Sequence, residues 1–202
     1  MVARFVLIYH LLLMLEKIQM QNLRVLSVGP IPQNAIQRFL PELSVETLLY
    51  GVSDEKMHEN RGVGRKFCFT TIGFFEDIKG QDILLQAFSM LPVEVRNKAE
   101  LYMVGHDLTL FAANLKKKYE ALKGVYFVGK VNRNRIHEIL SNTNVLVCPS
   151  RQDSMPTVVA EAMMHGVPCI VSDAIGTVEY LKHGDNGLIF QSENVERLSE
   201  LM

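Results

Sequence analysis

Short apolar runs alternate with amphipathic stretches from about residue 66 to the end of the chain. Runs rich in β-branched and aromatic residues predict buried strands at residues 67–72, 100–104, 125–128, 145–148, 169–172 and 188–190. Apolar residues at helical spacing predict helices over residues 79–91, 109–122 and 133–141, from about 156 to 165, near 178–181 and from 193 onward. This alternation indicates an α/β fold, a Rossmann-like parallel sheet of about six strands with helices on both faces.

The preceding residues are patterned less regularly. They predict a helix over residues 3–20, a strand at 23–28, a helix at 32–39 and a strand at 45–50. Residues 53–65 are polar and contain two glycines, as expected of a linker between domains. We therefore expect a small unit over residues 1–52, a linker at 53–65 and a main domain at 66–202.

Composition limits the classes of function. With 48% hydrophobic and 21% charged residues in 202, the chain is typical of a globular protein with a substantial core. Its net charge of −1 gives no basic field, so we expect no nucleic-acid partner. Cys68, Cys148 and Cys169 lie in strand-like runs without metal-ligand spacing, which predicts free buried thiols, no metal site and a reducing cytoplasm. The apolar run at residues 5–15 is too short to span a bilayer, and a buried helix is favoured over a membrane-contacting segment.

Residues 145–173 read as strand, polar loop, helix and strand. Asp153 or Ser154 can cap the helix, and Thr157 and Glu161 share one of its faces, a turn apart. A helix that begins after a polar loop suits an anionic or hydroxyl-rich ligand, and a carboxylate beside it can bind the paired hydroxyls of a ribose. A capping Asp153 and a solvated Glu161 remain the alternative interpretation.

A second loop, residues 73–80, joins a predicted strand to a predicted helix. Gly73 would let a phosphate approach the backbone, and Lys79 at the helix start could neutralise a diphosphate. An ordinary turn with a solvated lysine fits these residues equally well.

The block at residues 145–173 resembles the donor-binding motif of the retaining GT-B glycosyltransferases known as glycosyltransferase family 4, or glycosyl transferases group 1. That motif has two acidic residues separated by seven others, then a helix and a small-Gly-x-Pro turn; here they are Asp153, Glu161 and residues 165–168. The resemblance covers about residues 66–192. It implies that residues 66–202 are the C-terminal, donor-binding half of a GT-B fold, and residues 1–52 a remnant of the acceptor-side domain.

The resemblance also implies an enzyme, a hexosyl- or other glycosyltransferase of polysaccharide or exopolysaccharide biosynthesis. It would move a sugar from a UDP- or GDP-linked donor to a saccharide or lipid-linked acceptor, without a cofactor. In that scheme Lys79 holds the diphosphate, Glu161 the ribose and Asp153 the donor sugar, and the two acids form the catalytic pair. Further donor contacts are implied for Gly73, Gly105, Val131, Met155, Pro156 and Thr157.

The sequence departs from the family pattern at several points. Phe74 stands where the family has an arginine, Asp153 is shorter than the usual glutamate, and Ile175 replaces one glycine of a paired-glycine turn. These departures, with the missing acceptor half, support an alternative: a nucleotide-binding or regulatory fragment without turnover. Residues 116–118, all lysine, predict one solvated helix face, with a weak phospholipid contact at the inner side of a membrane as the alternative.

Overall fold

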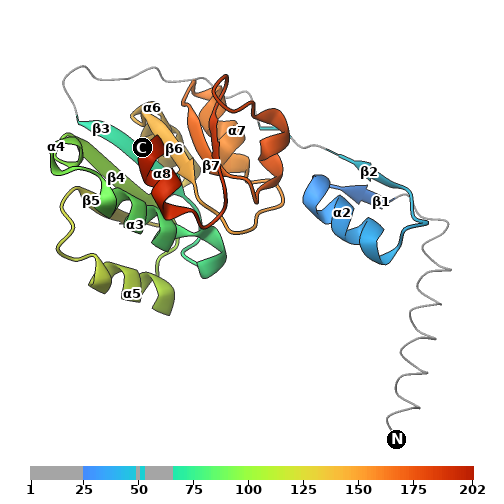
Figure 1. Ribbon diagram of the computed structural model, residues 1–202, viewed down its shortest axis with the longest axis horizontal. Coiled ribbons are helices and arrows are strands. Elements are labelled where there is room, and N and C mark those ends of the chain that lie inside the picture. Colours follow the sequence, from blue (N-terminus) through green and yellow to red (C-terminus); the bar gives the residue numbers. More distant parts are fainter. Residues whose placement is uncertain (1–24, 49–50, 53–65) are drawn as a thin grey trace, which may run out of the picture. The chain divides into compact units, whose positions relative to one another are not determined.

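The computed structural model describes residues 25–48, 51–52 and 66–202 (Figure 1). The chain divides into two compact units, Met1–Tyr50 and Gly51–Met202. The helix predicted over residues 3–20 and the linker predicted at 53–65 lie outside the described residues. Each unit is described below by itself.

The first unit contains a strand, a helix and a second strand, in the predicted order. Its elements are β1 (Val25–Ser27), α2 (Pro30–Phe39) and β2 (Val45–Thr47). The two strands pair in parallel, with Val25 opposite Val45. Gln33 of α2 donates its side-chain amide to the carbonyl of Val45 at 3.1 Å, which ties the helix to β2.

The second unit is built on one parallel sheet. Its strands are β3 (Phe67–Ile72), β4 (Ala99–Val104), β5 (Val125–Gly129), β6 (Val145–Cys148), β7 (Cys169–Ser172) and β8 (Leu188–Phe190). They lie in the order β5-β4-β3-β6-β7-β8, and every pairing is parallel. The predicted six-stranded parallel sheet is therefore confirmed.

This strand order creates one topological switch point, between β3 and β6. The chain runs outward from β3 through β4 to β5, then crosses back to place β6 on the other side of β3. The loops that follow β3 and β6 consequently leave the sheet in opposite directions and leave a crevice at the carboxyl ends of these strands. Ligands of open α/β sheets bind in such a crevice, so these two loops are the first place to look for a site.

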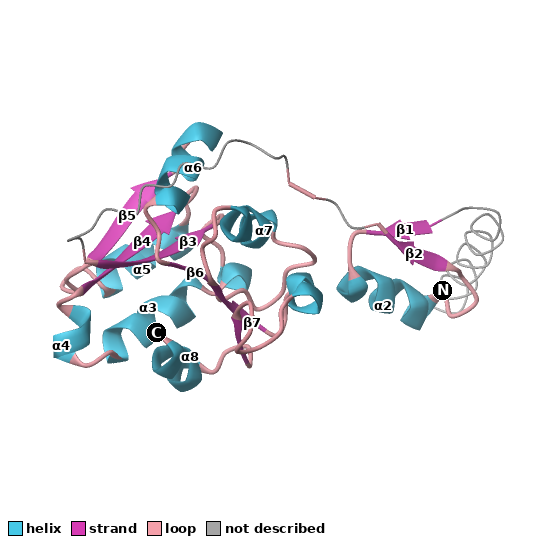
Figure 2. Ribbon diagram, turned by 90° about the horizontal axis from the view of Figure 1, so that it is seen from above, coloured by secondary structure: helices cyan, strands magenta, loops and turns pink. Residues whose placement is uncertain are grey.

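Helices cover both faces of the sheet. They are α3 (Gln81–Met90), α4 (Val93–Arg96), α5 (Leu110–Lys118), α6 (Arg133–Ser141), α7 (Thr157–Met164) and α8 (Val195–Leu201), with 3-10 turns η1 (Asp77–Lys79) and η2 (Gly176–Tyr180). Figure 2 shows α6 and α7 on one side of the sheet and α3 and α8 on the other. The side chains of the sheet divide accordingly: Val147 of β6 joins the core beneath α3, α5 and α8, while its neighbours Leu146 and Cys148 join the core beneath α6 and α7.

The apolar strand runs are explained by this double coverage. A strand buried on both faces favours apolar residues at successive positions, and β7 is buried along its whole length, with Ser172 as its one polar residue besides the Cys169 thiol. All three cysteines are free thiols, as predicted, and Cys148 and Cys169 are buried; the predicted burial is wrong for Cys68, which is only half-buried. Burial raises the pKa of the Cys148 thiol to about 11, so this thiol stays neutral beside the loop that follows β6.

Several element boundaries differ from the prediction, and one helix was missed. The helix expected from residue 79 begins only at Gln81, because Gly80 is left-handed (φ 67°) and separates α3 from the η1 turn. The last helix begins at Val195 rather than at residue 193, because Glu193 is also left-handed (φ 66°) and the Asn194 side chain caps the helix. The short helix α4 was not predicted, since four residues are too few to show a helical period.

Candidate functional site

The loops after β3 and β6 meet at the switch point through a close approach of their backbones. A Cβ atom on Gly80 would overlap the carbonyl of Pro149, so only glycine allows this contact. Across the same contact, the main-chain N–H of Arg151 donates to the carbonyl of Ile78 at 2.8 Å. The two predicted motifs, far apart in the sequence, therefore form one site.

An ion pair joins the two motifs. Lys79 Nζ donates to Asp153 Oδ2 at 2.6 Å. The lysine side chain is 29% exposed and the aspartate 16%, so the pair is screened by water only in part. The other carboxylate oxygen, Oδ1, accepts a hydrogen bond from the main-chain N–H of Met155 at 3.3 Å.

These contacts overturn the prediction that Asp153 or Ser154 caps the helix. The N-cap of α7 is Pro156, and no side chain accepts a hydrogen bond there. Asp153 is instead oriented by Lys79, a partner 74 positions earlier in the chain. An ionised lysine offers the carboxylate a stronger hydrogen bond than a neutral main-chain N–H does.

The Asp153 loop is also fixed from β7. Asp153 N–H donates to the carbonyl of Ala174 at 3.3 Å, and Gly176 N–H donates to the carbonyl of Asp153 at 2.9 Å. A Cβ on Gly176 would overlap the carbonyl of Ser154, so this glycine has a packing role. Ile175 of the same turn is fully buried in the core beneath α6 and α7. Asp153 is therefore held on both sides before any ligand binds.

Helix α7 carries the second acidic residue of the motif. Its buried face packs Val159 and Ala162 into the core, and Glu161 lies half-buried on another side. Within the described residues, no hydrogen bond or ion pair engages the Glu161 carboxylate. Thr157 is exposed in the first turn, whereas Met155 and Pro156 are buried, so a ligand at this end would reach those two mainly through the main chain. A carboxylate without a partner beside a helix start can accept hydrogen bonds from ligand hydroxyls.

The ends of β3, β4 and β5 form the other wall. Gly73 N–H donates to the carbonyl of Val104, and Gly105 N–H donates to that of Gly129, at 2.9 and 3.0 Å. Gly105 has φ 145°, and a Cβ there would overlap the carbonyl of Gly73, so the residue must be glycine. Apart from its chain neighbours, no heavy atom lies within 4 Å of a Cβ built on Gly73. The backbone at Gly73 is therefore open to a ligand.

Phe74 and Val131 lie at the same end of the sheet without joining the ion pair. The Phe74 ring is 60% exposed and meets the His106 ring edge-on, with centroids 5.9 Å apart. The Phe74 carbonyl accepts a hydrogen bond from the side chain of the buried Gln81 at 2.6 Å. This contact fixes the Phe74 backbone, and the sequence did not predict it. Val131 is half-buried in the loop after β5, and within the described residues no polar or ring contact links it to Lys79.

Arg151 is a further residue that sequence reasoning missed. Its guanidinium forms a bidentate pair with the carboxylate of Asp82, with N–O distances of 2.9 and 2.7 Å. Burial would raise the pKa of Asp82, but the hydrogen bonds and charge of Arg151 outweigh it and lower that pKa. The pKa of Arg151 is raised in turn, chiefly by its hydrogen bonds to Asp82. Both side chains are charged throughout the physiological range.

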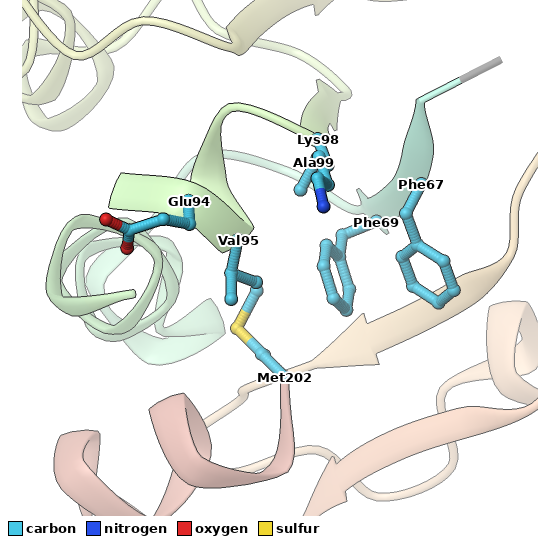
Figure 3. A pocket seen from close by; sticks show the side chains of 7 residues that line it. All are labelled: Phe67, Phe69, Glu94, Val95, Lys98, Ala99 and Met202. Carbon is cyan, nitrogen blue, oxygen red and sulfur yellow. The ribbon is translucent and has the colours of Figure 1, made fainter. Parts of the chain in front are cut away.

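Two apolar cavities lie at the opposite end of the sheet. One, of about 330 Å³, is lined by Phe67, Phe69, Glu94, Val95, Lys98, Ala99 and Met202 (Figure 3). The other, of about 500 Å³, lies at the amino ends of β6, β7 and β8. Both are remote from the loops at the carboxyl ends, where the ion pair, the open backbone and the unengaged carboxylate occur together. We therefore place the candidate site at the carboxyl ends.

Two searches were limited to the described residues. None of their helices has the length and apolarity that crossing a membrane requires. No three of their histidine, cysteine, aspartate and glutamate side chains gather closely enough to bind a metal ion.

Comparison with known proteins identifies the protein family. The family model for glycosyl transferases group 1 matches residues 52–202. Protein CapJ of Staphylococcus aureus is 28% identical over 152 residues, which are 74% of this chain and 38% of CapJ. Lipopolysaccharide glucosyltransferase WaaG of Escherichia coli is 26% identical over 125 residues, 61% of this chain and 33% of WaaG. The crystal structure of Anabaena HepE in complex with UDP superposes with a TM-score of 0.74 at 22% identity, covering 88% of this chain and 52% of HepE.

The chain therefore belongs to the glycosyl transferases group 1 family, as its motifs predicted. Its parallel sheet has the Rossmann-like architecture of the GT-B fold. The chain spans less than half the length of these curated relatives.

Proposed function

We propose that the second unit binds the nucleotide-sugar donor of a retaining glycosyltransferase, with a UDP- or GDP-linked sugar as the donor. One observation carries the proposal: the ion pair between Lys79 and Asp153, 2.6 Å long, joins the two loops at the switch point of the sheet. A cation, a carboxylate and an open backbone meet there, and this is the set of groups that a diphosphate linked to a sugar requires.

Each group has a separate task in the proposed site. The amine of Lys79 leaves Asp153 and binds the diphosphate, whose charge increases as the bond to the sugar breaks. The released Asp153 carboxylate accepts hydrogen bonds from hydroxyls of the donor sugar, and Glu161 accepts them from the ribose. Main-chain groups at Gly73, Gly105, Val131 and residues 155–157 surround the nucleotide. The hydroxyl oxygen of the acceptor bonds to the sugar carbon on the face from which the diphosphate departs and passes its proton to the departing diphosphate oxygen, so configuration is retained.

The relatives support this choice of substrates. WaaG is by name a lipopolysaccharide glucosyltransferase, and HepE has been crystallised with UDP. We propose a saccharide or lipid-linked acceptor, a role in polysaccharide biosynthesis and a cytoplasmic location. A peripheral membrane contact through residues 117–118 is part of the proposal; Lys116 is committed elsewhere, to Asp107 at 2.6 Å.

Calorimetric titration with UDP and GDP tests the donor site. The native chain should bind at least one of them, and Lys79→Ala or Glu161→Ala should weaken binding about tenfold or more, since a hydrogen bond to a charged group contributes roughly 1.5–3 kcal/mol. Lys117→Ala is the matched control, because this lysine is exposed on α5, and it should leave binding unchanged. If the native chain binds no nucleoside diphosphate, the proposal is refuted.

A binding module without turnover is the second candidate. It is favoured by Phe74, whose 60% exposed ring brings no positive charge to the open backbone at Gly73. Incubation with labelled nucleotide sugars and lipid-linked acceptors separates the candidates. Product above a Glu161→Ala control identifies a transferase. If no product forms, calorimetry decides: a transferase site holds the donor sugar through Asp153 and binds a UDP-sugar less well in Asp153→Ala, whereas a module without turnover binds UDP and the UDP-sugar alike in both proteins.

A further inference from the structure

Arg151 ties together four segments of the second unit. Its main-chain N–H donates to the carbonyl of Ile78 at 2.8 Å. Nη1 donates to the carbonyl of Asp77 at 2.5 Å and to Asp82 Oδ1 at 2.9 Å, and Nη2 donates to Asp82 Oδ2 at 2.7 Å. Nε donates to Glu193 Oε1 at 3.0 Å. One side chain therefore connects the loop after β6, the η1 turn, helix α3 and the loop before α8.

The position of Arg151 makes these contacts relevant to the site. Asp77 and Ile78 are the first two residues of the η1 turn, and Lys79 is the third. Asp153 follows Arg151 by two positions. Arg151 thus bonds the two carbonyls directly before Lys79, and it does so from the segment that carries Asp153.

The backbone at Glu193 provides a second observation. Among the described residues, Glu193 is the only one besides glycine with a positive φ, 66°. A side chain disfavours that conformation, which persists when the surroundings fix it. Here the glutamate carboxylate pairs with Nε of Arg151 at 3.0 Å.

We infer that Arg151 is a positioning residue of this site, which holds the turn bearing Lys79 against the loop bearing Asp153. The inference rests on the proposed function for the identity of the ligand. The guanidinium is already engaged by the carboxylates of Asp82 and Glu193, so it acts through Lys79 and not by contact with a phosphate. The planar fork matters as much as the charge, because the three N–H groups on the single nitrogen of a lysine could not serve all four acceptors of the guanidinium: both Asp82 oxygens, the Asp77 carbonyl and Glu193 Oε1.

The first test needs no ligand. Limited acylation of lysine amines, read by mass spectrometry of peptides, compares Lys79 with the exposed Lys117 within each sample. Arg151→Gln and Arg151→Lys should both raise the labelling of Lys79 relative to Lys117 by about threefold or more, as its ion pair loosens. Arg135→Gln is the matched control, because Arg135 has an exposed pair with Glu138, and it should change nothing.

A purely structural Arg151 gives a different result. The thermal midpoint would fall in Arg151→Gln, while the labelling ratio in the folded protein stayed at the native value, and the inference would be overturned. If Arg151→Gln fails to fold, Asp82→Asn weakens the same fork at its other end with almost no change in size. An unchanged ratio in folded Asp82→Asn counts equally against the inference.

The second test uses UDP and a double-mutant cycle. In the native background Lys79→Ala should weaken UDP binding about tenfold, and in the Arg151→Gln background by less than about twofold, because the lysine there is already misplaced. If the loss of UDP affinity in the double variant equals the product of the losses in Lys79→Ala and Arg151→Gln, the inference is overturned. If the native chain binds no nucleoside diphosphate, the proposed function fails, and the labelling experiment still judges Arg151 by itself.

Discussion

Replacing Asp153 with asparagine should make the chain bind a nucleoside diphosphate more tightly, although Asp153 belongs to the proposed site. In the free protein the Lys79 amine is held by this carboxylate at 2.6 Å, so a diphosphate must compete for the lysine. It must also approach a fixed negative charge. Asparagine keeps the size of the side chain and an oxygen that can accept from Met155 N–H, and it removes the charge.

The size of the effect follows from the ion pair. A hydrogen bond between charged groups contributes roughly 1.5–3 kcal/mol, and water at the partly exposed lysine reduces that figure toward about 1. At a separation of about 8 Å, one Debye length at physiological salt, a like charge costs about 2 kcal/mol at an effective dielectric constant of about 20, before salt screening. We expect a net gain of about 1–2 kcal/mol for UDP, which is about five- to thirtyfold in Kd.

Calorimetry on four proteins measures this gain. The native chain, Asp153→Asn, Lys79→Ala and the double variant are titrated with UDP and with a UDP-sugar. The gain should appear in Asp153→Asn and be smaller when the double variant is compared with Lys79→Ala, because only the removal of the negative charge acts there. It should also be smaller for the UDP-sugar, whose hydroxyls no longer meet a carboxylate. If Asp153→Asn weakens UDP binding as Lys79→Ala does, the reasoning is refuted, because the carboxylate would then be helping to bind the diphosphate.

Three further predictions concern stability and turnover. Gly80→Ala should destabilise the fold by about 2 kcal/mol or more, because its Cβ would overlap the Pro149 carbonyl; Gly184→Ala, also at positive φ (82°) but in open space, should cost less in a urea titration. The lowered pKa of Asp82 beside Arg151 stabilises the fold above the ordinary aspartate pKa of 3.8, and this stability is lost as the pH falls through the lowered pKa. Asp82→Asn should therefore flatten the dependence of the unfolding free energy on pH in that acid range. An unchanged slope would contradict the prediction. The 202 residues alone should transfer sugar negligibly, because the acceptor must be held against the donor sugar, and product above a Glu161→Ala control would disprove this.

Much of the fold could be read from the sequence because its strands are buried on both faces. Apolar runs such as residues 145–148 and 169–172 predict strands from the local sequence alone, without knowledge of the strands they pair with. The boundaries at Gly80 and Glu193 could not be read in the same way. Each depends on a left-handed backbone that tertiary contacts impose, a packed carbonyl in one case and the pair with Arg151 in the other.

Part of the candidate site could likewise be predicted from the sequence, and part depends on long-range contacts. The topology of a parallel sheet brings loops at carboxyl ends together, so the meeting of the Lys79 and Asp153 loops follows from the order of the strands. The ion pair itself, and the fork of Arg151 on Asp82, depend on side-chain directions across about seventy residues of sequence. Local reasoning therefore assigned Asp153 to the cap of α7, the nearest partner in the chain.

Amide chemical-shift mapping of the labelled chain with UDP tests most directly whether the donor binds at the carboxyl ends of β3 and β6. The largest shifts should come from Gly73, Gly105 and Thr157, and they should be much reduced in Lys79→Ala. Shifts concentrated at Val95 and Lys98, beside the cavity at the amino ends of the strands, would contradict the proposed site. So would an unchanged spectrum at millimolar UDP.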